Sequence, residues 1–406
     1  MHNQHAKYAV AAILLSLCTL GAGFAVQDSP YLRLFDEICE KIETAFYDAR
    51  FVEKKFPEIK QVYKNRITGV ASEAEFSKLL NEMLEKLNAS HTNYYTPHDY
   101  AYYHLAAIFS FLPEIKNLFG QQEIKYPSIG IIAQEIGKQI FIASVLSGSA
   151  AEKAGLQSGD EILSVDGEPY SSIRALQAKI GGEAIFKIRR TESGSAIEIK
   201  TKPVMCDPKQ EFLEAQRNSI RIYEQHGKRI GYVHLWSYAG EEYHDEFLRA
   251  ISVGELKSAE ALIFDLRYGW GGASPEYLHA FAAQTPVLKM IDREGKERIF
   301  KPRWDKPVAM LVNGSVRSGK ELLAFGFKKY KLGTVIGERT AGATLGGRVF
   351  VLSNKAMLFL AVQDTRIDEV RLEGAGVEPD ITVLMDIRYC QGKDVQLDAA
   401  LTHLSR

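Results

Sequence analysis

Ser318, in the sequence RSGKELL, has a setting in which a hydroxyl could act as a nucleophile. An apolar run ending at Val312 predicts a strand, and the apolar spacing from Gly319 onward predicts a helix. A hydroxyl at a helix N-terminus lies beside unpaired N–H groups, where an oxyanion can be stabilised. The spacing of Ser318 and Glu321 also fits a capping box, in which the serine only satisfies helix N–H groups. On the residues alone both interpretations stay open.

Three further segments carry residues that suit acyl transfer. Ser90 and His91 follow a predicted helix, where a histidine is either a solvated turn residue or a general base. The apolar run 261–267 predicts a buried strand, and the sequence YGWGG follows it. Glycine there permits either a tight turn or the close approach of a backbone N–H to a bound carbonyl. Glu373 lies in a third loop, where a glutamate is either a solvated carboxylate or part of the site.

These segments resemble, in matching order, the serine-peptidase family of tail-specific (C-terminal-processing) and tricorn proteases. The resemblance rests on Asp265-Leu266-Arg267, Gly271-Gly272, Val312-Asn313, Ser318, the GERT sequence at 337–340 and the GVEPD sequence at 376–380. It implies that Ser318 is the nucleophile. It also implies that Gly271 or Gly272 supplies one oxyanion N–H and Gly319 the other. The family's tail-specific branch carries a general-base lysine where this chain has Ala343.

The resemblance to the tricorn branch implies a different base. That branch has a Ser-His pair in a leucine-x-x-Ser-His setting, which Leu87 to His91 match, and a supporting glutamate at the position of Glu373. It therefore implies His91 as the base, with Ser90 and Glu373 supporting it. Lys320 is a weaker alternative base, because side chains two positions apart on a helix point to different faces.

Residues 126–203 resemble a PDZ domain. The resemblance rests on Ser128, Ile129, Gly130 and Ile131 as the peptide-binding loop and strand, and on the GDEILSVDG sequence at 159–167. Such a domain adds an extended peptide to a sheet edge, while backbone N–H groups hold its terminal carboxylate. The predicted partners are therefore polypeptide substrates with free C-termini. The alternative is a decayed spacer domain.

Composition and the N-terminal sequence limit the partners and the cellular location that the protein can have. The chain has 406 residues and a formal net charge of −1, with no long run of positive or negative residues. This composition argues against nucleic acid as a binding partner. The N-terminus predicts a secretory leader at 1–25, from Lys7, the apolar run 8–20 and the small residues to Ala25. The protein is therefore expected to be periplasmic or extracellular, without a stable membrane span after cleavage. An uncleaved anchor or a lipid on Cys18 are the alternatives. Histidine and cysteine spacings indicate no metal, no cofactor is implied, and the cysteines are expected as buried thiols.

The predicted fold is multidomain α+β. We expect a helical N-terminal domain at 26–125, a β-rich PDZ domain at 126–203, and an α/β domain at 204–406, crotonase-like by the resemblance. Helices are predicted at 208–225 and 395–404. The function implied is that of an exported serine endopeptidase that recognises C-termini through the PDZ domain. The alternative is an inactive pseudo-peptidase that binds peptides.

Overall fold

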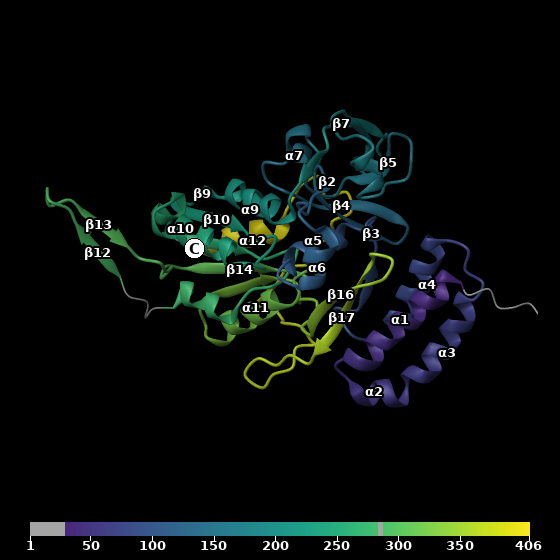
Figure 1. Cartoon of the computed structure of the whole chain (residues 1–406). Helices are drawn as coiled ribbons and strands as arrows, with labels where there is room; N and C mark the ends of the chain where they lie inside the picture. Colours follow the sequence, from purple (N-terminus) through teal and green to yellow (C-terminus); the bar gives the residue numbers. More distant parts are fainter. Residues whose placement is uncertain (1–28, 283–286) are drawn as a thin grey trace, which may run out of the picture.

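A computed structural model describes residues 29–282 and 287–406, so the predicted leader at 1–25 lies outside the described residues. The architecture is multidomain α+β, as the sequence predicts. Helices gather at the N-terminal end, a small β-rich unit lies above, and a layered α/β unit forms the rest (Figure 1). No helix in the described ranges is long and apolar enough to cross a membrane.

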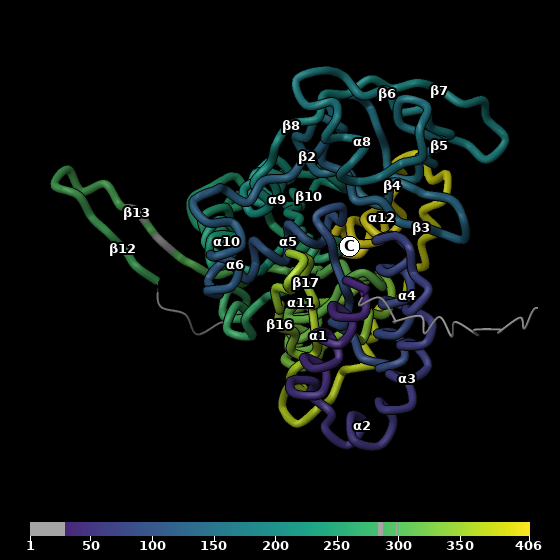
Figure 2. The backbone as a smooth tube through the Cα atoms, turned by 45° about the vertical axis from the view of Figure 1, so that its right-hand side comes forward, coloured from purple at the N-terminus to yellow at the C-terminus, as the bar shows by residue number. Residues whose placement is uncertain are grey.

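The N-terminal helices form because their apolar faces have a partner and their ends are capped. Ser29, Asp48 and Ser72 each accept a backbone N–H at a helix start, and Ser72 makes the predicted bond from the Glu75 N–H at 3.3 Å. These helices share one hydrophobic core with the late part of the chain, including Leu358. Figure 2 shows α1 close to the late strands of the chain. Their bounds are α1 Pro30–Ala45, α2 Ala49–Lys54, α3 Phe56–Ile67 and α4 Glu73–Glu85.

A three-stranded sheet joins the N-terminal part to the α/β unit. Strand β1 (Asn93–Tyr95) pairs antiparallel with β17 (Met357–Gln363), which pairs with β16 (Gly346–Val351). Helices α5 (Tyr100–Ile108) and α6 (Pro113–Phe119) follow β1 and pack on the same sheet. The pairing brings the segment just before β1 next to residues more than 250 positions later.

The β-rich unit contains a five-stranded antiparallel sheet in the order β3-β4-β5-β6-β7, so β3 lies at an edge. Its core is small and apolar and includes Ile129, Ile131 and Leu176. The bounds are β3 Ile131–Ile136, β4 Gln139–Val145, α7 Ala150–Ala154, β5 Glu161–Val165, α8 Arg174–Gln177, β6 Ala184–Arg189 and β7 Ile197–Thr201. Strands β2 (Tyr126–Ser128) and β8 (Val204–Cys206) pair with each other where the unit joins the rest of the chain.

The α/β unit is built on a six-stranded sheet in the order β18-β15-β14-β11-β10-β9, parallel except where β9 pairs with β10. Its central strands read as apolar runs because both faces are covered by helices. The strands are β9 Arg221–Gln225, β10 Lys228–His234, β11 Ala261–Asp265, β14 Val308–Val312, β15 Thr334–Gly337 and β18 Ile381–Thr382. The helices are α9 Pro208–Ser219, α10 Glu241–Ser252, η1 Glu255–Ser258, η2 Pro275–Phe281, α11 Gly319–Lys329 and α12 Val395–Leu404.

A buried ionic network fixes α12 to the end of β11. The Arg267 guanidinium donates to Asp265 Oδ2 at 2.6 Å and to Asp394 Oδ2 at 2.6 Å. Burial acts to raise the pKa of Asp265, but Arg267 and His234 outweigh it and hold that pKa below its usual range. The Asp-Leu-Arg sequence thus has a structural role here, which orders the loop that follows β11.

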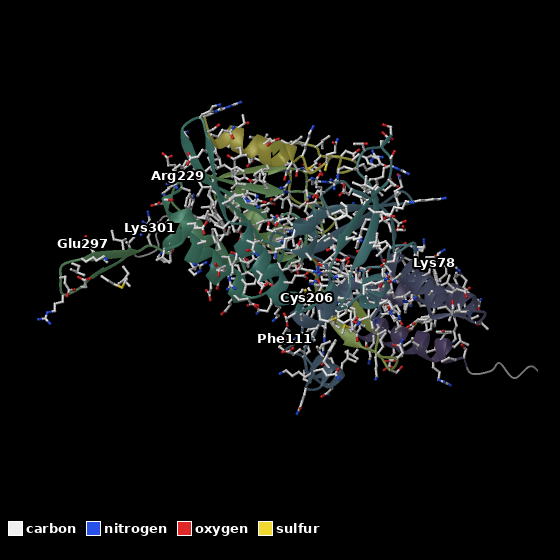
Figure 3. The ribbon with its side chains drawn as sticks, turned by 90° about the horizontal axis from the view of Figure 1, so that it is seen from above. Lys78, Phe111, Cys206, Arg229, Glu297 and Lys301 are labelled. Atoms are coloured by element: carbon white, nitrogen blue, oxygen red, sulfur yellow. The ribbon has the colours of Figure 1, made fainter. Side chains whose placement is uncertain are left out.

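One feature lies outside these layers. Strands β12 (Leu288–Ile291) and β13 (Glu297–Phe300) form a hairpin that projects from the body, and Figure 3 labels Glu297 far out along it. The three cysteines in the described ranges are free, and Cys39 is the fully buried one.

Candidate active site

Ser318 immediately precedes α11, on a sharp turn from β14. Its backbone has φ 58° and ψ −136°, a left-handed φ that costs a non-glycine residue conformational energy. The Ser318 N–H donates to the Ala343 carbonyl at 2.8 Å, which holds the turn against the glycine-rich loop. The side chain makes no cap hydrogen bond, so the capping-box interpretation is wrong. The hydroxyl is left available at the helix N-terminus.

Glu321 binds the loop at 340–343 through its carboxylate. It is buried, and its carboxylate accepts from the N–H groups of Gly342 and Ala343, both at 2.7 Å, and from Thr340 Oγ1 at 2.5 Å. Burial raises the pKa of this carboxyl, while the same hydrogen bonds oppose the rise. Glu321 therefore orders the loop that contains Ala343, instead of closing the helix end.

The structure brings Ser90, His91 and Glu373 into one hydrogen-bonded chain. Ser90 Oγ donates to Glu373 Oε2 at 2.9 Å and lies 2.9 Å from His91 Nδ1. Glu373 also accepts from the Ser90 N–H at 2.9 Å and from the Thr344 and Leu345 N–H groups at 2.7 and 3.1 Å. Because the single hydroxyl proton of Ser90 goes to the carboxylate, Ser90 Oγ must accept from Nδ1–H. The His91 Nε2 is then the unprotonated nitrogen, as a base requires.

The environment of His91 favours its neutral form. Burial and, to a smaller extent, the nearby Arg317 guanidinium lower the pKa of His91 to about 4, although Glu373 acts in the opposite direction. The ring packs against Phe359, with ring centroids 5.2 Å apart. A neutral imidazole with a fixed tautomer is thus maintained at neutral pH.

The glycine loop after β11 lies against Ser318. A Cβ built on Gly271 would lie 2.6 Å from the Ser318 Cβ, so only glycine fits there without displacing the serine. A Cβ on Gly319 would meet the Ala273 carbonyl oxygen at 2.4 Å. The N–H groups of Gly271, Gly272 and Gly319 donate to no described residue, which leaves them free to bind a ligand oxygen.

These residues surround one cavity of about 350 Å³. Ser90, His91, Gly271, Gly272 and Ser318 all line it. Much of the remaining wall is apolar, and it comes mainly from α5 and β17: Leu105, Ile108, Phe109 and Phe359. The sequence interpretation missed these side chains, because nothing in the local pattern of α5 relates it to Ser318.

Comparison with known proteins accounts for three parts of the chain. The model of peptidase family S41 matches residues 229–383, that of the PDZ domain matches 124–183, and that of the tricorn protease C1 domain matches 31–85. The chain therefore contains a peptidase S41 domain, a PDZ domain and a tricorn C1 domain. Its S41 region contains Gly271, Gly272, Ser318 and Glu373, whereas Ser90 and His91 follow the C1 region.

Relatives of the chain include carboxyl-terminal-processing proteases and tricorn-like proteases. A carboxyl-terminal-processing protease of Synechocystis sp. is 26% identical over 287 residues, covering 66% of this chain and 65% of that protein. A tricorn protease homolog of Saccharolobus solfataricus is 26% identical over 375 residues, covering 86% of this chain and 32% of that protein. The chain thus spans about two thirds or less of the length of these curated relatives.

Solved structures show the same fold. The tricorn protease superposes with a TM-score of 0.58 at 21% identity, over 92% of this chain and 36% of that chain. The photosystem II D1 C-terminal processing protease superposes with a TM-score of 0.51 at 18% identity, over 93% and 98%.

Lys320 lies away from the cavity at Ser318. The side chain is 1% exposed, and its ammonium donates to four backbone carbonyls, none of them at Ser318. Lys320 is absent from the residues that line the cavity with Ser318 and His91. This placement gives no support to Lys320 as the base.

The predicted peptide-binding loop of the PDZ domain, residues 128–131, is buried, and one of its N–H groups already has a partner within the loop. Ile129 and Ile131 are buried in the PDZ core, and the Gly130 N–H donates to Ser128 Oγ at 2.9 Å. Ser128 in turn donates to the part-buried Glu211 at 2.5 Å. A groove of about 960 Å³ follows the edge strand β3, and it shares the lining residues Tyr95, Trp270 and Arg317 with the cavity at Ser318.

No group of three or more histidine, cysteine, aspartate or glutamate side chains in residues 29–282 and 287–406 is arranged to hold a metal ion.

Proposed function

We propose that this chain is a serine endopeptidase that hydrolyses peptide bonds in protein or peptide substrates through an acyl-enzyme. The observation that carries the proposal is the hydrogen-bonded chain Glu373–Ser90–His91, of which Ser90 and His91 line the same cavity as Ser318, whose hydroxyl makes no cap hydrogen bond. A nucleophile, a neutral base with a fixed tautomer and free backbone donors are the parts that acyl transfer needs.

In this mechanism His91 Nε2 takes the hydroxyl proton as Ser318 Oγ attacks the scissile carbonyl carbon. The new oxyanion is held by N–H groups from Gly271 or Gly272 and from Gly319. The imidazolium returns its proton to the leaving amine, and the acyl-enzyme remains. Water, deprotonated by the same nitrogen, then attacks the ester and releases Ser318. Glu373 acts through Ser90 by stabilising the positive imidazolium.

Recognition of substrate C-termini is assigned to the PDZ domain in this proposal. The edge strand β3 can accept an extended peptide, and the groove beside it adjoins the cavity through Tyr95, Trp270 and Arg317. A polypeptide held at β3 therefore has a continuous path toward Ser318. Export to the periplasm or the outside of the cell belongs to the proposal too, and it rests on the leader sequence at 1–25.

Active-site labelling tests the proposal directly. The purified chain is treated with a fluorophosphonate, and modification is located by mass spectrometry, with Ser318→Ala as the matched control. We expect a single label on Ser318 and hydrolysis of peptides from a broad library. A parent protein that neither labels nor hydrolyses would support the inactive peptide-binding alternative instead.

A further inference from the structure

Lys320 lies one residue beyond the proposed oxyanion donor Gly319, yet its side chain turns into the protein interior. It is 1% exposed and sits in the first turn of α11. Burial of a lysine is costly unless its ammonium is hydrogen-bonded. In this protein the ammonium has no carboxylate partner among the described ion pairs and is satisfied by main-chain oxygens alone.

The four acceptors come from two neighbouring strand ends. Lys320 Nζ donates to Leu235 O at 2.6 Å and Trp236 O at 3.0 Å, just beyond β10. It also donates to Leu266 O at 3.1 Å and Tyr268 O at 3.0 Å, just beyond β11. One side chain on α11 therefore joins the chain segments that leave two adjacent parallel strands.

The segment beyond β11 is the one that carries the glycine donors. Tyr268 N–H donates to Ser315 Oγ at 2.7 Å, and Trp270 N–H donates to the Trp236 carbonyl at 2.7 Å, an oxygen that Lys320 also binds. Gly271 follows directly and contacts Ser318. The position of the Gly271 and Gly272 N–H groups thus depends on bonds that meet at the Lys320 ammonium.

We propose that Lys320 is a positioning residue that locks the two halves of the oxyanion hole together, Gly271–Gly272 on the loop after β11 and Gly319 on α11. The inference rests on the proposed function, because it concerns the same oxyanion. Lys320 does not touch substrate. It acts by fixing the separation of donors on two different elements, on which transition-state stabilisation depends steeply.

The charge of the lysine matters to this bond set, because a neutral amine has two protons for four carbonyls. Burial, with a smaller contribution from Arg317, lowers the pKa of Lys320 to about 7, although Asp265 on β11 acts to raise it. Arg267 and His234 are the other charged or titratable groups in this region. As pH rises through about 7 the Lys320 ammonium loses a proton, and its hydrogen bonding to the loop after β11 should weaken.

The test replaces Lys320 by methionine, which keeps a similar length but cannot donate. Lys329→Met on the same helix is the matched control, since Lys329 is exposed and pairs with Asp368. We expect Lys320→Met to lower kcat by about 10²- to 10³-fold, the cost of losing one oxyanion donor, with KM within about threefold of the parent. The rate of fluorophosphonate labelling should fall in parallel, while the affinity for a product peptide stays unchanged.

The pH profile separates positioning from simple stability. The kcat of the parent should fall as pH rises through about 7, and this alkaline limb should be missing from Lys320→Met. Unchanged kcat in a folded Lys320→Met, or a fall that appears in KM alone, would overturn the inference. If Lys320→Met does not fold, Lys320→Arg is measured instead, because it keeps the buried cation. A parent-like kcat in Lys320→Arg would show that exact placement of the carbonyls is not needed, and would overturn the inference. A parent that fails to label or hydrolyse refutes the proposed function itself.

Discussion

Replacing Gly271 by alanine tests how closely the loop of the proposed oxyanion donors fits against Ser318, the proposed nucleophile. The added Cβ would lie 2.6 Å from the Ser318 Cβ and 2.7 Å from the Arg317 carbonyl oxygen. Gly271 does not have a positive φ, so alanine can adopt its backbone conformation. The substitution therefore acts only through the contact of the added Cβ with Ser318 and Arg317. To reach ordinary contact at 3.4 Å, the loop and Ser318 must separate by about 0.8 Å.

The size of the effect follows from that displacement. A misplacement of about 1 Å at a catalytic group costs on the order of 10²-fold in rate. We therefore expect Gly271→Ala to lower kcat/KM about 100-fold, equivalent to about 2.7 kcal/mol of transition-state stabilisation. The free energy of unfolding should change much less, because the loop can yield toward the cavity.

The assay is hydrolysis of a fluorogenic peptide, with urea unfolding measured on the same preparations. Gly314→Ala is the matched control: it lies in the turn before Ser318, and its Cβ would meet only Arg339 O at 3.9 Å. The control should hydrolyse at the parent rate. A Gly271→Ala enzyme within about threefold of the parent would show that the glycine loop is not fitted to Ser318 as described.

Three further predictions concern the base, its support and the PDZ domain. Because burial lowers the pKa of His91 to about 4 and the base must be neutral, kcat/KM should rise with pH through about 4 and be level by pH 6; an acid limb at 6.5 would contradict this. Glu373→Gln should lower kcat by about 10- to 100-fold, since the amide nitrogen cannot accept from the Ser90 N–H, whereas Glu378→Gln on the same loop should be silent; equal rates in peptide hydrolysis would remove Glu373 from the mechanism. A peptide with a free C-terminal carboxylate should bind at least about tenfold more tightly than its amide in calorimetry, and equal affinities would argue against carboxylate capture at the loop 128–131.

The sequence predicted those parts of the protein whose determinants are local. The helix at 395–404 and the strand predicted at 261–267 follow from apolar patterns, and the structure contains both, with the strand ending at Asp265. Ser90, His91 and Glu373 were each named from a short motif, and the structure joins them by hydrogen bonds.

The rest could not be predicted because it depends on long-range contacts. Glu321 has the spacing of a capping residue, but the loop at 340–343 offers it three donors, which compete successfully for the same carboxylate. Lys320 looks like an ordinary helix residue until the ends of β10 and β11 place four carbonyls around it. The apolar wall from α5 likewise exists only after β1 has paired with β17.

The contact between Ser90 and Glu373 joins residues 283 positions apart, and this has a consequence for synthesis on the ribosome. Ser318 emerges before Glu373, so a growing chain already carries the nucleophile while the histidine still lacks its orienting partner. Closing so long a loop also has to wait until β17 is available to pair with β1. In the proposed mechanism, proteolytic activity therefore arises only after Glu373 has been synthesised, which protects nascent chains.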